Sequence, residues 1–170
     1  RTIVATIIPR CAAGNSVYIW AFHERSAIRA ACLNSALSTF VFDYAARNKI
    51  GGMNANFYIL KQLPVIPPSR YEEEFLGERL ADVVAGRVLE LVYTAWDIRA
   101  FAQDLGDEGP PFVWDEERRA QLRAQLDAIY FHRARGRGVY HEHVPDRGAQ
   151  GPGGAWHLPH PRPDPGLLRR

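Results

Sequence analysis

The residues best suited to contact another molecule are concentrated in one stretch, NKIGGMNANFYILKQLPVIPPS, at residues 48–69. Gly51 and Gly52 lack a side chain and let the backbone take conformations closed to other residues. Asn54 and Asn56 carry amides that both donate and accept hydrogen bonds, and three prolines force a rigid, extended exit. A hydrophobic core does not need these features together. The stretch therefore predicts a surface that presses its backbone against another molecule.

The charges divide sharply along the chain, although the formal net charge is only +2. Residues 1–70 hold eight Lys or Arg against two acids, and residues 71–132 hold six against fourteen. Residues 133–170 hold seven against three. Such an asymmetry favours one face for a polyanion and another for solvent or a partner. The alternative is a chance sorting of charges on a solvated surface.

Strand-forming residues open the chain. Thr2–Pro9 is β-branched and apolar, which predicts a buried strand that proline ends. Gly14 and Asn15 mark a turn, and Val17–Phe22 predicts a second strand. Together these segments predict an antiparallel hairpin at the edge of a sheet within the first 25 residues.

After the expected hairpin, apolar residues recur at helical spacing. The expected helical segments are Ser26 to about Arg47, Asn56–Gln62, Glu72–Tyr93, Trp96–Leu105 and Glu116 to about His132. Ser26 and Asp115 are good N-caps, and Gly51 and Gly52 should stop the first helix. The predicted fold class is α+β and mostly helical, with a small N-terminal antiparallel hairpin or sheet edge followed by four or so helices.

The last part of the chain, residues 133–170, is rich in Arg, Pro and Gly and has no periodicity. We expect it to be a disordered tail. Four histidines at positions 141, 143, 157 and 160 could suggest a metal site. Without an ordered scaffold they would not keep a fixed geometry, so no metal is predicted.

Several functional classes find no support in the sequence. It has no P-loop, no H-E-x-x-H and no G-x-S-x-G motif. No run approaches the roughly 18 apolar residues of a membrane span, so we expect no membrane partner. Cys11 and Cys32 do not form a disulfide framework. A cytoplasmic location is the expectation.

A family resemblance rests on three stretches that follow one another along the chain: RTIVATIIPR, LNSALSTFVFDYAARNKIGGMNANFYILKQLPVIPP and ELVYTAWDIRAFAQDLGDEGPPFVWDEERRAQLRAQLDAIYFH. Residues 1–132 resemble the C-terminal part of large bacterial adenine-N6 DNA methyltransferases with target-recognition domains. These include fused type IIG restriction–modification enzymes and methylases of phage-defence systems. The resemblance implies methylation of adenine in a defined DNA sequence with S-adenosylmethionine as donor. The catalytic domain, and the true start of the protein, would lie upstream.

The resemblance also implies which residues contact double-stranded DNA. The glycines would admit phosphates close to the backbone, the asparagines would suit adenine edges, and the cations would contact phosphates. The set is Arg47, Lys49, Gly51, Gly52, Asn54, Asn56 and Lys61. In the alternative, the glycines only end a helix and the asparagines only cap backbone groups in a turn. Phe57–Leu60 is interpreted as core and not as a base-stacking platform.

The resemblance implies a division of labour within the parent protein. Residues 1–69 would end the DNA target-recognition domain, and residues 70–132 would form a C-terminal helical region against the upstream methyltransferase domain. The family's catalytic loop needs an acid or amide before its prolines, which IPPS and GPPF lack. We therefore expect no catalytic and no cofactor-binding residue here, with S-adenosylmethionine bound only by the parent. Enzymatic activity of the chain itself is left open.

The tail departs from the family pattern after His132. A one-base shift of Tyr140–Leu168, written in permitted codons, can read like the family's usual ending. We therefore interpret residues 133–170 as the product of a frameshift. Two alternatives to DNA recognition stay open: a helical interaction scaffold that docks a helicase or nuclease partner, and a truncated gene product without function.

Overall fold

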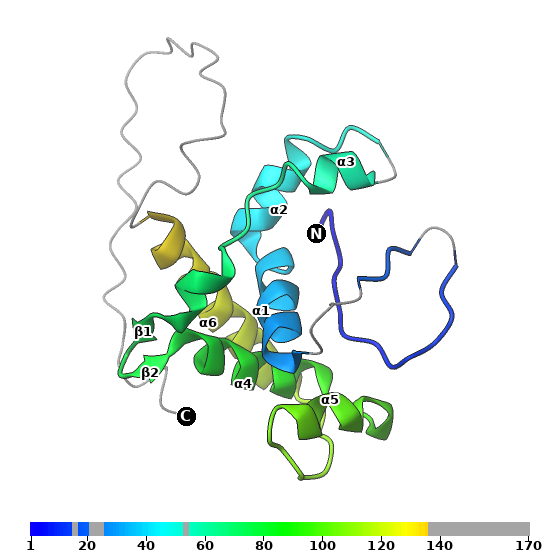
Figure 1. Ribbon diagram of the computed structural model, residues 1–170, viewed down its shortest axis with the longest axis vertical. Helices are drawn as coiled ribbons and strands as arrows, with labels where there is room; N and C mark the ends of the chain where they lie inside the picture. The colour runs from blue at the N-terminus through cyan, green and yellow to red at the C-terminus, as the bar shows by residue number, and fades with distance from the viewer. Residues whose placement is uncertain (15–16, 21–25, 53–54, 136–170) are drawn as a thin grey trace.

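The protein is described by a computed structural model that covers residues 1–14, 17–20, 26–52 and 55–135. It is mostly helical with one small antiparallel sheet of two strands, which confirms the predicted class (Figure 1). The described residues form six α-helices: α1 (Ala27–Leu37), α2 (Phe40–Arg47), α3 (Phe57–Leu60), α4 (Leu80–Val92), α5 (Arg99–Asp104) and α6 (Glu116–Arg135). The strands are β1 (Glu74–Phe75) and β2 (Glu78–Arg79), and 3₁₀ turns occupy Pro68–Glu72 and Trp96–Ile98.

Helices α1, α4 and α6 form a central bundle around the main hydrophobic core (Figure 1). Small buried residues, Ala31 on α1 with Ala81 and Ala85 on α4, let α1 and α4 approach closely. Leu126 and Ile129 of α6 complete the core. Because this core joins residues from both sides of position 69, that boundary does not separate two cores.

A buried tyrosine pair ties three segments of the bundle together. The hydroxyl oxygens of Tyr71 and Tyr130 lie 2.8 Å apart. Both hydroxyls also lie within hydrogen-bonding distance of the carbonyl oxygen of Cys32 in α1, at 3.3 and 3.1 Å. Buried phenol hydroxyls need such partners. The pair therefore links the Pro68–Glu72 turn, α1 and α6 at a point closed to solvent.

The helix expected from Ser26 to Arg47 is divided into α1 and α2. Ser26 caps α1 as predicted, since its Oγ accepts from the backbone N–H of Arg29 at 3.3 Å. Thr39 makes the break: its hydroxyl donates to the carbonyl of Ala36 at 2.9 Å and accepts from the N–H of Phe42 at 3.4 Å. One side chain thus ends α1 and caps α2.

The helix expected to begin at Glu72 begins later in the structure. The chain instead forms the Pro68–Glu72 turn and then the β1–β2 hairpin, and α4 begins only at Leu80. Leu76 and Gly77 both have positive φ, 57° and 87°, and form the two-residue connection. Such φ values are those of a hairpin turn whose twist matches its strands. The antiparallel pair therefore lies at residues 74–79.

The hairpin expected in the first 25 residues is not found in the part that the structure describes. Residues 1–14 and 17–20 contain no strand; residues 21–22, the end of the second expected strand, lie outside the described range. The first residues run beside the helices, and Ile3 packs against a small core of Phe42, Ala46 and Leu63. With no described strand to pair with, the apolar start of the chain packs on helices.

From residue 93 to residue 135 the structure follows the sequence-based expectation closely. Asp115 caps α6, with Oδ1 accepting from the N–H of Arg118 at 2.9 Å. Helix α6 extends three residues beyond the expected end at His132. Arg133 belongs to the fold, because its guanidinium pairs with Glu73 at 2.6 Å. The expected tail therefore cannot begin at Arg133, and residues 136–170 lie outside the described residues.

Among the described helices, none combines the length and the apolar character needed to cross a membrane.

Candidate nucleic-acid interface

The residues expected to contact DNA lie in one part of the molecule, the α2–α3 segment, which we define as residues 40–62. It comprises α2, the loop after it, and α3. Figure 1 shows this segment extending beyond the central bundle, with α3 at its far end. Leu60 and Leu63 anchor it against Phe42 and Ala46 in their own small core. The fold thus presents the segment on one side of the bundle, held by α2.

Arg47 has a structural partner. Its Nε donates to Oδ2 of Asp43 at 2.9 Å; the Asp43 side chain is 7% exposed and that of Arg47 is 63% exposed. The backbone N–H of Thr2 also donates to Asp43. Burial disfavours the ionised carboxylate, but the bonds from Thr2 and Arg47 outweigh it and lower the pKa of Asp43. Arg47 therefore stabilises a buried charge as well as facing solvent.

Lys49 and Lys61 are the cations of the segment without a carboxylate partner among the described residues. The ammonium of Lys49 donates to Oε1 of Gln62 at 3.4 Å, which links the loop after α2 to the end of α3. The ammonium of Lys61 lies 5.0 Å from the centre of the Phe57 ring. Both side chains are exposed. Their positive charges are thus presented to solvent.

The glycines and asparagines are only partly placed. Gly51 and Gly52 are exposed, and a Cβ at either would meet nothing within 4 Å. Neither is among the described residues with positive φ, so their backbone does not require glycine. Asn56 is exposed at the N-cap of α3 and makes no side-chain capping bond. Asn54 lies outside the described residues.

Aromatic side chains on the segment are more exposed than the sequence predicts. Phe57, expected to point inward, is 52% exposed, and Tyr58 is also exposed. Phe40 and Tyr44 on α2 are exposed as well. The interpretation of Phe57–Leu60 as core is therefore wrong for Phe57 and Tyr58. Flat rings beside cations can stack on bases or contact a protein partner.

The positive excess of residues 1–70 is reduced by contacts. Arg1 pairs with Asp127 of α6 at 3.3 Å, and Arg70 pairs with Glu73 at 3.0 Å. With Arg47, at least three of the eight cations in this range have a carboxylate partner among the described residues. The sequence count could not reveal this, because two of the three partners lie beyond residue 70. Lys49 and Lys61 are therefore the stronger candidates for phosphate contact.

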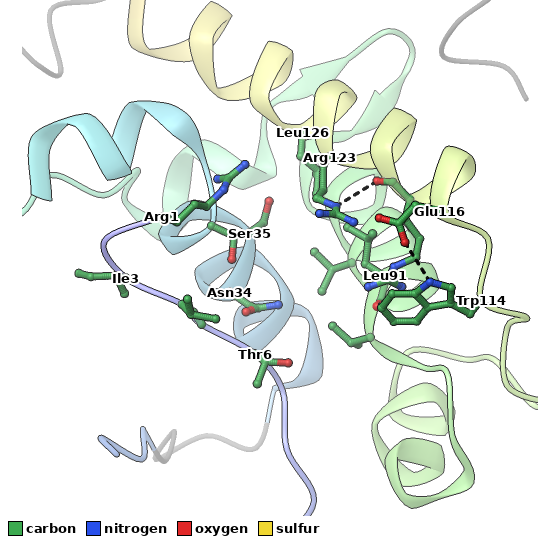
Figure 2. A pocket seen from close by; sticks show the side chains of 16 residues that line it. Arg1, Ile3, Thr6, Asn34, Ser35, Leu91, Trp114, Glu116, Arg123 and Leu126 are labelled. Carbon is green, nitrogen blue, oxygen red and sulfur yellow. Dashed lines mark hydrogen bonds between the residues drawn. The ribbon is translucent and has the colours of Figure 1, made fainter. Parts of the chain in front are cut away.

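Sequence reasoning missed a cleft of about 570 Å³ between the first six residues, α1, α4 and α6 (Figure 2). We call it the arginine cleft after Arg1, Arg119 and Arg123, which line it. The other lining residues are Ile3, Val4, Ala5, Thr6, Asn34, Ser35, Ser38, Val88, Leu91, Val92, Trp114, Glu116 and Leu126. No motif announces it, because its residues come from four distant segments.

No catalytic constellation emerges in the described part of the chain. Within those residues no three His, Cys, Asp or Glu side chains gather as metal ligands. The thiol of Cys32 is buried, and burial raises its pKa to about 12, which keeps it in the unreactive protonated form. The four histidines at 141, 143, 157 and 160 lie outside the described residues.

Comparisons of the chain with protein families, curated proteins and solved structures found no match.

Proposed function

We propose that this chain is the DNA-contacting, non-catalytic part of a site-specific adenine-N6 DNA methyltransferase of a restriction–modification or phage-defence system. The α2–α3 segment would lie against double-stranded DNA. The central bundle would pack against an upstream methyltransferase domain that binds S-adenosylmethionine and carries out the transfer. The protein would act in the cytoplasm.

One observation supports the proposal above the others. Lys49 and Lys61 both reach solvent from the α2–α3 segment, and no described carboxylate pairs with either. Exposed cations without an internal carboxylate partner can exchange counterions for phosphates, and this exchange supplies most non-specific affinity for DNA. Gly51 and Gly52 beside Lys49 leave open space where a phosphate could approach the backbone.

The test is a titration of fluorescent duplex DNA across salt concentrations with the double variant Lys49→Ala, Lys61→Ala. Each lost phosphate contact should reduce the slope of log affinity against log salt by about 0.9. Arg99→Ala is the matched control: Arg99 is also an exposed cation over an aromatic ring, Trp96, but lies on α5. An unchanged slope in the double variant would remove the α2–α3 segment from the interface.

Catalysis has its own test. With S-adenosylmethionine supplied, the isolated chain should transfer no labelled methyl group to DNA. Methylation by clean protein, abolished by heat denaturation, would contradict the assignment of catalysis to an upstream domain.

The interaction scaffold is a second candidate function, and the exposed aromatic rings of the α2–α3 segment favour it. Exposed Phe and Tyr clusters are typical of protein interfaces. Phe57→Ala with Tyr58→Ala separates the two ideas. If the rings stack on DNA, the variant should lose DNA affinity at every salt concentration. If they dock a helicase or nuclease, DNA affinity should be unchanged.

A third possibility is a truncated gene product without function. It predicts a folded chain that binds neither DNA nor a protein partner. It would be favoured if neither the lysine pair of variants nor the Phe57 and Tyr58 pair changed the binding of DNA or of a protein partner.

A further inference from the structure

The arginine cleft has the volume of a small-molecule site. Its volume of about 570 Å³ lies within the roughly 300–1,000 Å³ usual for ligand pockets. Aliphatic side chains of α4 and α6, including Leu91, Val92 and Leu126, form an apolar surface. Figure 2 shows Asn34 and Ser35 across the cleft from Arg123 and Trp114. A few polar groups around an apolar surface are what fix a ligand's orientation.

Three residues that line this cleft each have a buried polar side-chain atom without a partner. In the part of the chain that the structure describes, Oδ1 of Asn34, Oγ of Ser35 and Nε of Arg119 are the buried side-chain atoms that make no hydrogen bond. All three residues line the cleft, and Ser35 is only 2% exposed. Buried polar groups are nearly always satisfied, so each exception needs an explanation. Their gathering points to a polar ligand that supplies the missing partners.

The charge of the lining identifies the ligand's sign. Arg119 and Arg123 are one helical turn apart on α6, and the lining contains three arginines and one carboxylate, that of Glu116. Glu116 already accepts from Nε1 of Trp114 at 3.1 Å, and Arg1 is paired with Asp127. Burial first, and then the charge of Arg123, lower the pKa of Arg119. Two like charges held together in this way are relieved by an anion.

The guanidinium groups of Arg119 and Arg123 each contact neighbouring groups and keep N–H donors that are not used in those contacts. Nη1 of Arg119 donates to the carbonyl of Leu91 at 2.7 Å, and its guanidinium stacks on the Trp114 ring at 3.7 Å. Nε of Arg123 donates to the carbonyl of Arg119 at 3.3 Å. These contacts position both planar groups and leave other N–H donors available. Arginine forks suit phosphate oxygens, which accept two parallel bonds.

We propose that the arginine cleft binds a phosphomonoester with a flat or apolar body, such as a mononucleotide. Arg119 and Arg123 hold the phosphate, whose second ionisation near pH 6 makes it a dianion at neutral pH. The dianion carries two negative charges, and Arg119 and Arg123 carry two positive ones. The body lies against Leu91 and Leu126, and the Ser35 hydroxyl and Asn34 amide bond its polar edge.

The proposal is tested by calorimetric titration of the full chain at pH 7.5 with adenosine monophosphate, adenosine and inorganic phosphate. Adenosine monophosphate should bind, and removal of its phosphate in adenosine should weaken binding at least tenfold. Inorganic phosphate should bind the same site more weakly, because it lacks the body. No heat from adenosine monophosphate at millimolar concentration, or equal binding of adenosine, would overturn the proposal.

Two variants probe the site without disturbing the fold. Arg123→Gln changes an exposed side chain and should lower affinity for adenosine monophosphate about tenfold, since a charge-assisted bond is lost. Ser35→Ala removes a buried hydroxyl without a partner, so it should keep the melting temperature and still weaken binding. Arg99→Gln, an exposed cation outside the cleft, is the control. Equal effects of Arg123→Gln and Arg99→Gln would refute the site.

The phosphate could belong to a free nucleotide or to the end of a DNA strand, and competition distinguishes these sources. A 5′-phosphorylated oligonucleotide that displaces adenosine monophosphate, and whose binding also depends on Arg123, identifies DNA. Displacement by neither phosphorylated nor unphosphorylated oligonucleotide identifies the free nucleotide. Because no residue of the α2–α3 segment lines the cleft, failure here leaves the proposal for Lys49 and Lys61 untouched.

Discussion

The central bundle and the α2–α3 segment use the same residue types in opposite ways. In the bundle, Tyr71 and Tyr130 are buried and their hydroxyls bond each other and the carbonyl of Cys32. In the segment, Tyr44 and Tyr58 are exposed, and Tyr44 is 74% accessible to solvent. The buried tyrosines of the bundle contribute to the stability of the fold. The exposed tyrosines of the segment do not, so stability does not explain their presence. Aromatic content alone therefore does not distinguish scaffold from contact surface; the packing around each ring does.

The largest expected effect is a difference in unfolding free energy between two tyrosine substitutions, one in each region. Tyr130→Ala in the bundle should cost about 3–5 kcal/mol of unfolding free energy, as truncation of a buried aromatic ring does. Tyr44→Ala on α2 should stay within about 0.5 kcal/mol, because the ring is solvated. Urea denaturation measures both. Similar losses would mean that the contrast between the regions is wrong.

The next effect concerns the carboxylate that holds the segment to the start of the chain. Asp43→Ala leaves the Thr2 N–H and the Arg47 guanidinium without their acceptor and should cost about 1–3 kcal/mol. Asp97→Ala, at an exposed carboxylate, is the control and should change little.

The same carboxylate gives a pH signature. The folded pKa of Asp43 is below its ordinary value. Its contribution is therefore present above the unfolded pKa of about 3.9 and is lost as pH falls through the lower folded value. The stability difference between the natural protein and Asp43→Asn should narrow in acid. A difference independent of pH would exclude this ionisation as the cause.

A smaller effect sharpens the boundary of the bundle. Arg133→Ala removes the pair with Glu73 at 2.6 Å and a bond to the carbonyl of Glu74 at 3.1 Å. Because Glu73 is partly exposed, the loss should be only about 0.5–1 kcal/mol of unfolding free energy. Thermal denaturation beside Arg99→Ala measures it. If the two variants melt alike, Arg133 does not contribute to the fold.

The smallest effect is one of reactivity and leaves stability unchanged. Cys11 is exposed and Cys32 is buried in the bundle, where burial raises the thiol pKa to about 12. A thiol reagent at pH 8 should modify Cys11 in the native protein and Cys32 only after denaturation. Prompt reaction of both would show that the bundle opens around Cys32. Cys11→Ser should leave a native protein without reactive thiol.

Local signals in the sequence predicted local structure well. Ser26 and Asp115 cap the helices expected of them, and α5 and α6 lie close to their expected places. The failures arise where two signals compete. The apolar spacing runs unbroken through Thr39, which hides the break, and the acidic run before Leu80 resembles a helix start although it precedes a hairpin.

The two candidate sites also differ in how much of each could be predicted from the sequence. The α2–α3 segment is contiguous in sequence, so its cations and glycines could be singled out, but the partner of Arg47 and the exposure of Phe57 could not. The arginine cleft depends on residues near 1, 35, 90 and 120, which only the packed helices bring together. The sequence could not show that the Ser35 hydroxyl lacks a partner, because the fold determines which groups surround a serine.

Asp127 has a consequence for the order in which the chain folds during synthesis. Its carboxylate accepts from the N–H of Phe40, the first residue of α2, at 2.7 Å across 87 positions of sequence. A ribosome makes that acceptor several seconds after α2 itself, at about 5–20 residues per second. In that interval only Thr39 caps α2. The α2–α3 segment can form early against α1, but it gains its contacts with α6 only when that helix has been made.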